Sequence, residues 1–168
     1  MAYTLDTLAS TLKSAEYAPM TEEEILRQAQ AQYGAAYERQ VLGAQQAAIG
    51  ETTIGGRREL SNTNGYFDIT NLSMLALERG ATAREDILVM GSLAEKYGYS
   101  DGGEELTVID GKEAWIFEII GPGPLWQVGD KEPGAFWVAQ RVKDGYVSAS
   151  ANTPAIRQIE WDNKDEFM

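Results

Sequence analysis

Residues 105–120 read ELTVIDGKEAWIFEII, and this stretch decides which kind of fold the chain can adopt. Two runs rich in β-branched and aromatic residues flank the step Asp110-Gly111, which favours a tight hairpin turn. The stretch therefore predicts two antiparallel strands, 105–110 and 113–120. A similar arrangement around Asp144-Gly145, with AFWVAQRV before it and YVSAS after it, predicts a second hairpin.

A helix is predicted upstream of the first hairpin. Asp68 or Thr70 is a suitable capping residue, and Gly80 is expected to close the helix in a left-handed backbone conformation. The apolar residues between them recur at helical spacing: Leu72, Leu75, Ala76 and Leu77.

A second helix is predicted directly after the first. Thr82 and Glu85 form a capping box, and Gly98 is expected to end the helix. One face carries its apolar and small residues: Ile87, Met90, Gly91, Ala94 and Tyr97.

The region before these helices has two parts. IGETTIGGR at 49–57 is a short β-branched run between glycines and predicts a strand. Residues 1–47 are rich in Ala and Gln, contain a capping box at Thr21 and Glu24, and predict a helical N-terminal segment. We therefore expect a helical segment over 1–47 and a domain over 48–168, with an α+β fold in which helices pack on one face of an antiparallel sheet.

The composition excludes several classes of function. The chain has 168 residues, is 43% hydrophobic, and carries a formal net charge of -12, which disfavours binding to nucleic acid or to anionic membranes. It contains neither Cys nor His, so a Ser-His-Asp or Cys-His catalytic arrangement is impossible within it. No stretch has the length or apolar character of a membrane-spanning helix. We expect a cytoplasmic protein without a cofactor.

Other candidate sites have simpler structural explanations. Acid pairs such as Glu104-Glu105 lack the glycine and the ligand spacing of a calcium loop, and are interpreted as solvated surface. The glycine-rich steps lack the spacing of phosphate-binding loops and are interpreted as turns. Three tryptophans, Trp115, Trp126 and Trp137, are expected in the sheet core or as loop anchors.

Several stretches resemble, in the same order, the PepD-type dipeptidases, which are N-terminal-nucleophile cysteine peptidases related to the secernins. They are AIGETTIGGRREL (48–60), LALERGATAREDILVMGSLAEKYGY (75–99), GEELTVIDGKEAWIFEIIGPGP (103–124), GAFWVAQRVKDGYVSASAN (134–152) and AIRQIEWDNKDEFM (155–168). No resemblance is found for residues 1–47. The resemblance implies part of an αββα sandwich in which an N-terminal cysteine cleaves dipeptides with its own α-amino group as base.

The resemblance also implies roles for individual residues. Asn152 matches an asparagine that helps to form the oxyanion hole in this class, although without the resemblance it would be interpreted as a turn residue. Glu51, Thr52 and Thr53 would lie on a strand bordering the active site and face the substrate. Arg57 would bind a peptide carboxylate, or form a surface ion pair with an acid such as Glu59.

The chain departs from the family pattern in several respects, two of which concern the catalytic site. It has no cysteine to act as nucleophile, and Thr153-Pro154-Ala155 replaces the Gln-x-Arg expected after the asparagine. Two hypotheses follow. The first is a dipeptidase-type domain that is inactive by itself, with a peptide as its substrate if another segment supplies the nucleophile. The second is a structural or assembly protein whose N-terminal helices form a homo-oligomer.

Overall fold

The computed structural model describes residues 47–168, which fall within one compact unit, Gln45–Met168. The predicted helices of the N-terminal segment therefore lie outside the described residues. In chain order the elements are β1 (Ala48–Gly55), the 3-10 helix η1 (Arg58–Leu60), α4 (Ile69–Arg79), α5 (Ala83–Tyr97), β2 (Gly103–Ile109), β3 (Ala114–Ile120) and β4 (Phe136–Arg141).

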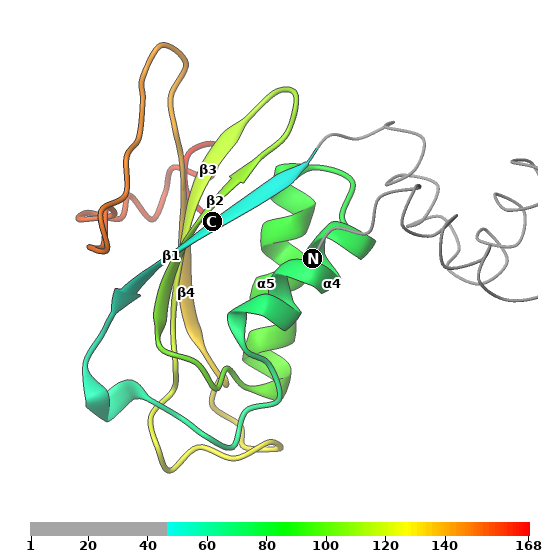
Figure 1. Cartoon of the computed structure of the whole chain (residues 1–168), viewed down its shortest axis with the longest axis vertical. Helices are drawn as coiled ribbons and strands as arrows, with labels where there is room; N and C mark the ends of the chain where they lie inside the picture. Colours follow the sequence, from blue (N-terminus) through cyan, green and yellow to red (C-terminus); the bar gives the residue numbers. More distant parts are fainter. Residues whose placement is uncertain (1–46) are drawn as a thin grey trace, which may run out of the picture. The chain divides into compact units, whose positions relative to one another are not determined.

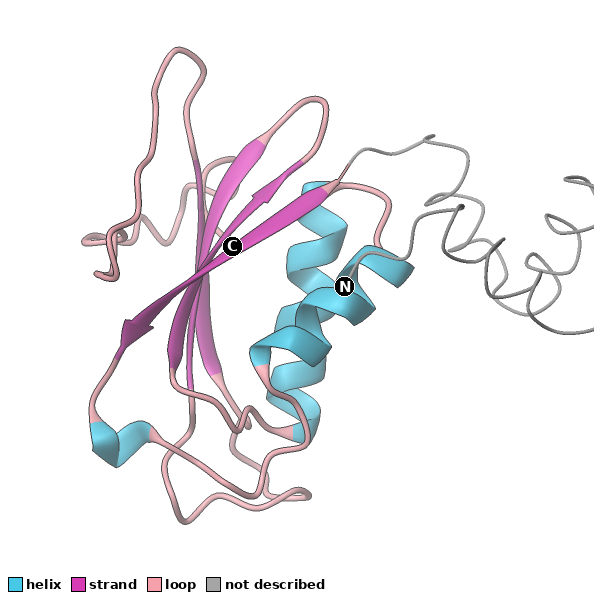
Figure 2. Ribbon diagram, viewed as in Figure 1, coloured by secondary structure: helices cyan, strands magenta, loops and turns pink. Residues whose placement is uncertain are grey.

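The four strands form one antiparallel sheet in the order β1-β2-β3-β4 (Figure 1). β1 is separated from β2 in sequence by both helices, yet pairs with it along almost its whole length. Figure 2 shows α4 and α5 together on one side of the sheet. This arrangement confirms the predicted α+β class, the β2–β3 hairpin and the helix layer on one face.

The core lies between the sheet and the two helices. Side chains alternate across a strand, so the register fixes which residues face the helices. We call this side of the sheet the helix-facing side. The core contains, from the helices, Leu72, Ala76, Ile87, Met90 and Ala94, and from the strands Leu106, Val108, Trp115, Phe117, Ile119 and Ala139. Burying each of the larger of these side chains stabilises the fold by roughly 1.5–3 kcal/mol.

The predicted caps are present at both helix N-termini. Asp68 accepts a hydrogen bond from the backbone N–H of Asn71 at 2.7 Å, and Thr82 accepts one from Glu85 N–H at 3.2 Å. Gly98 ends α5 with φ 84°, a conformation in which glycine is favoured. The tryptophan predictions also hold for Trp115, which is in the core, and for Trp126, whose indole anchors the 121–134 loop through Glu132 O.

The prediction of a left-handed Gly80 is wrong, because its φ is -78°. Glycine is required there for a different reason. A Cβ atom at this position would collide with the carboxylate and the backbone of Asp86 in the following helix. The residue therefore permits close packing of the α4–α5 connection and does not serve a special backbone conformation.

The predicted second hairpin is also wrong. No strand follows β4 among the described residues at 146–150, and Tyr146 and Val147 are largely exposed. The free edge of β4 is paired instead with the C-terminal residues of the chain. Ala139 and Met168 exchange backbone hydrogen bonds of 2.9 and 3.0 Å, and Arg141 N–H donates to Glu166 O at 2.8 Å. Pairing with 166–168 occupies the position that the hairpin would need.

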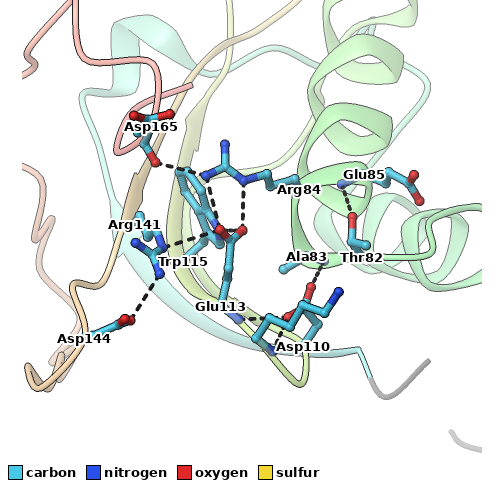
Figure 3. Close-up of polar contacts among 11 residues, drawn as sticks. Thr82, Ala83, Arg84, Glu85, Asp110, Glu113, Trp115, Arg141, Asp144 and Asp165 are labelled. Carbon is cyan, nitrogen blue, oxygen red and sulfur yellow. Dashed lines mark hydrogen bonds and ion pairs between the residues drawn. The ribbon is translucent and has the colours of Figure 1, made fainter. Parts of the chain in front are cut away.

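Glu113 joins the helix layer to the sheet (Figure 3). Its carboxylate accepts two hydrogen bonds from Arg84, at 2.8 and 3.2 Å, and one from the Trp115 indole N–H at 3.0 Å. Arg141 on β4 approaches the same carboxylate at 3.5 Å, and Arg84 also donates to Asp165 O at 3.0 Å. The carboxylate of Glu113 thus connects α5, the β2–β3 hairpin and β4, and Arg84 extends the connection to the backbone of Asp165.

These contacts make the stability of the fold depend on the charge of Glu113. The Arg84 hydrogen bond lowers the pKa of Glu113 against the opposing effect of burial, and Trp115 and Arg141 add to the lowering. A carboxyl whose pKa is lower in the folded state stabilises the fold above its unfolded pKa, and this stabilisation is lost as the pH falls through the folded pKa.

We expect Glu113→Gln to lower the free energy of unfolding at pH 7 by about 1–3 kcal/mol, because the ion pairs with both arginines are lost. The difference from the wild type should shrink on acidification below about pH 4.5, where the unfolded carboxyl of the wild type takes up a proton. Urea unfolding at several pH values measures both effects. Asp144→Asn, which removes an exposed partner of Arg141, is the control and should change stability little. An equal loss in both variants would contradict the role assigned to Glu113.

Candidate functional site

β1 divides the predicted site residues between the two sides of the sheet. The register pairs Thr52 with Glu105, and Thr53 with Glu104. Glu51 and Thr53 therefore lie on the helix-facing side, whereas Thr52 points to the opposite side, which no described helix covers. We call that opposite side, carrying Thr52, Glu105 and Glu118, the far face.

On the far face the structure brings Thr52 and Asn152 together. The Thr52 hydroxyl donates to Asn152 Oδ1 at 3.3 Å, across 100 residues of sequence. Asn152 is exposed and has φ 56°, the left-handed conformation that asparagine tolerates better than most residues. Because Oδ1 accepts the hydroxyl proton, the NH₂ group of the amide is left to donate to a ligand.

Thr52 is followed across the sheet by two acids, Glu105 and Glu118, which the sequence analysis did not identify as site residues. Glu105 on β2 is directly opposite Glu118 on β3, in the same cross-strand row as Thr52. The backbone N–H of Ala155 donates to both carboxylates, at 3.1 Å to Glu105 and 2.6 Å to Glu118. The N–H of Ile156 donates to Glu118 at 2.8 Å. The C-terminal tail is therefore bound across the far face.

The environment of Glu118 favours its neutral form. Burial raises the pKa of its carboxyl, and the neighbouring Glu105 raises it further, while the N–H groups of Ile156 and Ala155 oppose the rise. The interpretation of Glu104-Glu105 as solvated surface is wrong, because these side chains are only 4% and 2% exposed. The hairpin register was the signal in the sequence that could have placed Glu105 opposite Glu118.

A second acidic cluster lies on the helix-facing side. Thr53 Oγ1 donates to Glu51 Oε1 at 3.3 Å, and Thr53 pairs in register with Glu104. Burial raises the pKa of Glu104 to about 7, and the adjacent Glu51 carboxylate adds to the rise. Tyr99 is buried nearby, and burial together with Asp101 and these acids raises the pKa of its hydroxyl well above the ordinary value. Glu51 and Thr53 thus belong to this cluster and not to the Asn152 site.

Arg57 joins neither group. It is exposed at the start of η1, and its side chain forms no hydrogen bond or ion pair, with Glu59 or any other residue, within 47–168. In the same part of the chain, no group of three or more acidic side chains is arranged to hold a metal ion. A hollow of about 610 Å³ between the end of α5 and residues 128–133 contains none of the predicted site residues.

The sheet, its single layer of helices and the bound tail define a two-layer α+β domain with a polar site on the far face. The chain belongs to peptidase family C69, whose family model matches residues 9–168. The prediction of a dipeptidase-type family is thereby confirmed. The match begins at residue 9, so the prediction that residues 1–47 lie outside the family is wrong for most of that segment.

One similar protein is a probable dipeptidase from Latilactobacillus sakei, which is 30% identical over 87 residues. The alignment covers 52% of this chain but 16% of that relative, so the similarity concerns a small part of the longer protein. No helix within residues 47–168 is both long and apolar enough to cross a membrane.

The raised pKa of Glu104 predicts that stability falls as the pH rises. An acid whose pKa is higher in the folded state holds its proton more tightly there, so its contribution is complete below the unfolded pKa of 4.5 and is lost towards the folded pKa of about 7. We expect Glu104→Gln, which mimics the protonated acid, to raise the free energy of unfolding at pH 8 by on the order of 2 kcal/mol.

Chemical denaturation between about pH 5 and pH 8 measures this effect, and the variant should show a shallower fall of stability with pH. Glu78→Gln, an exposed acid on α4, is the control and should keep the wild-type slope. If Glu104→Gln also keeps that slope, Glu104 is already ionised in the folded protein at low pH and the prediction fails.

Proposed function

We propose that this chain forms one wall of the substrate cleft of a dipeptidase-type hydrolase, with Asn152 as the donor that binds the oxyanion. The contact between Thr52 Oγ1 and Asn152 Oδ1 is the observation that carries this proposal. In this scheme the contact holds the amide through its oxygen and leaves its N–H groups to donate to a ligand. Membership of peptidase family C69 supports an amide-cleaving function for such a donor.

The chemistry of the donor fits the reaction. When an amide bond is attacked, negative charge develops on the carbonyl oxygen, and a fixed N–H donor stabilises that charge more than it stabilises the substrate. Removing one such donor typically costs roughly 3–4 kcal/mol of transition-state stabilisation. Thr52 acts on the substrate only through Asn152 in this scheme, because its hydroxyl proton is used to hold the amide.

The arrangement of the sheet and its helix layer fits a cleft formed between this sheet and a second one. Both described α-helices, α4 and α5, lie on one side of the sheet, and the far face carries the polar row of Thr52, Glu105 and Glu118. We infer that this domain supplies one helix layer and one sheet of an αββα sandwich, with the far face turned towards the second sheet. Glu51 and Thr53, on the helix-facing side, are not part of the proposed cleft.

The nucleophile must come from elsewhere in this scheme. The chain contains no cysteine, so it cannot form the thioester of a cysteine peptidase by itself. We propose that a second segment bearing the nucleophile completes the site, and that a peptide is the substrate of the completed site. Alone, the chain is expected to bind a dipeptide-like ligand without cleaving it.

A phosphinic pseudodipeptide tests the donor, because its anionic phosphinyl oxygens resemble the tetrahedral oxyanion. We expect the chain to bind it and Asn152→Asp to bind it at least about tenfold more weakly, since Asp keeps the acceptor for Thr52 but loses both N–H donors. Isothermal titration calorimetry measures the affinity. Asn152→Gly, which keeps the left-handed backbone without adding a charge, is the matched control and should fall between the two.

Equal affinity of the wild type and Asn152→Asp would contradict the role of the amide. A separate incubation with a panel of dipeptides tests the expected lack of cleavage. Hydrolysis by the purified wild type that disappears in Asn152→Asp would show that the chain carries its own nucleophile.

A further inference from the structure

The pairing of Glu105 with Glu118 is expected to lower the stability of the sheet. The two carboxyls are directly opposite on neighbouring strands, Glu105 is 2% exposed, and Glu118 is partly buried. Like charges in directly opposed positions destabilise a strand pair, and burial adds a desolvation cost. A threonine or valine at either position would hold the sheet together without this cost, so stability of the sheet does not explain the pair.

The carboxyl oxygens of Glu105 and Glu118 accept hydrogen bonds from the backbone of the C-terminal tail. Pro154 has no N–H, and the next two backbone N–H groups, those of Ala155 and Ile156, both donate to this pair. Ala155 N–H lies within hydrogen-bonding distance of both carboxylates and therefore bridges them. Three hydrogen bonds, of 3.1, 2.6 and 2.8 Å, therefore attach the segment that follows Asn152 to the two carboxyl groups.

Asn152 is only three residues before Ala155, and Pro154 between them has a restricted φ angle. The segment is therefore fixed at both ends on the far face. Thr52 holds the Asn152 side chain, and the acid pair holds the backbone after Pro154. Thr52, Glu105 and Glu118 lie in one cross-strand row, so three adjacent strands define the position of the amide.

We propose that Glu105 and Glu118 form a clamp that positions Asn152, and that they are positioning residues of the site. They act on the tail backbone and make no contact with the ligand of Asn152. The position of the amide depends on the clamp whether or not a ligand binds. Only the consequence for binding rests on the proposed function.

Variants on both sides of the clamp test this proposal in the full-length chain. Glu118→Ala removes the acceptor of two hydrogen bonds, whereas Glu118→Gln keeps a carbonyl oxygen at the same place. Ala155→Pro removes the bridging N–H from the tail and leaves every residue of the sheet unchanged. Thr107→Ala, an exposed far-face residue of β2 outside the clamp, is the matched control.

Two measurements on the ligand-free protein report on the clamp. Hydrogen exchange of Ile156 N–H should accelerate up to about tenfold in Glu118→Ala, the change expected when the acceptor of one hydrogen bond is removed. The NMR signals of the Asn152 side-chain NH₂ should move to the positions of an unstructured asparagine in Glu118→Ala and Ala155→Pro. They should stay near the wild-type positions in Glu118→Gln and Thr107→Ala.

The exchange of Phe117 N–H in β3 shows in the same samples whether the sheet is intact. If Glu118→Ala loses this protection, Ala155→Pro alone decides the outcome. Wild-type Asn152 signals in Ala155→Pro, or in Glu118→Ala with an intact sheet, would overturn the clamp. Restoration by Glu118→Gln after loss in Glu118→Ala would support it.

Affinity for the phosphinic pseudodipeptide separates the two proposals. If both are correct, binding weakens at least about tenfold in Ala155→Pro and is retained in Glu118→Gln. If the wild type does not bind this ligand but the Asn152 signals still depend on the clamp, the proposed function fails and the clamp stands. If binding depends on Asn152 but is unchanged in Ala155→Pro with unchanged NMR signals, the clamp fails and the proposed function stands.

Discussion

The burial of one side of the β2–β3 hairpin under the helices is the constraint on which the rest of this structure depends. Because strand residues alternate between the two sides, placing Leu106 and Phe117 in the core also places Glu105 and Glu118 on the far face. The same register, carried to β1, puts Thr52 in their row. A slip of one residue would bury the acids among apolar side chains, so the core itself fixes the polar row.

Carboxyl groups that are buried or partly buried are stabilised in three different ways in this structure. Glu113 is paired with arginines, which lower its pKa and connect helix, hairpin and tail. Glu104, beside Glu51, has its pKa raised to about 7 by burial and so keeps its proton under mildly acidic conditions. Glu105 and Glu118 receive backbone N–H groups from the tail. In a chain with a net charge of -12, cationic partners are few, and protons and backbone amides take their place.

The chain belongs to a peptidase family but contains no cysteine, so the question is which part of the reaction its own residues can perform. The described residues form a sheet with one face covered by helices and a tail fixed across the other. In the proposed function, the amide of Asn152 is the group that stabilises the developing negative charge. The clamp and the Thr52 contact give it a defined position without any contribution from a bound ligand.

The sequence by itself determined what depends on near neighbours: the caps at Asp68 and Thr82, the turn after Asp110, and the α+β class. It also indicated the family. It failed where distant residues compete for one position, as when residues 166–168 pair with β4 in place of 146–150. Only the tertiary structure separated Thr52 from Glu51 and joined the tail to Glu105 and Glu118, because the side on which a residue lies and the partner it meets are set by long-range pairing and burial.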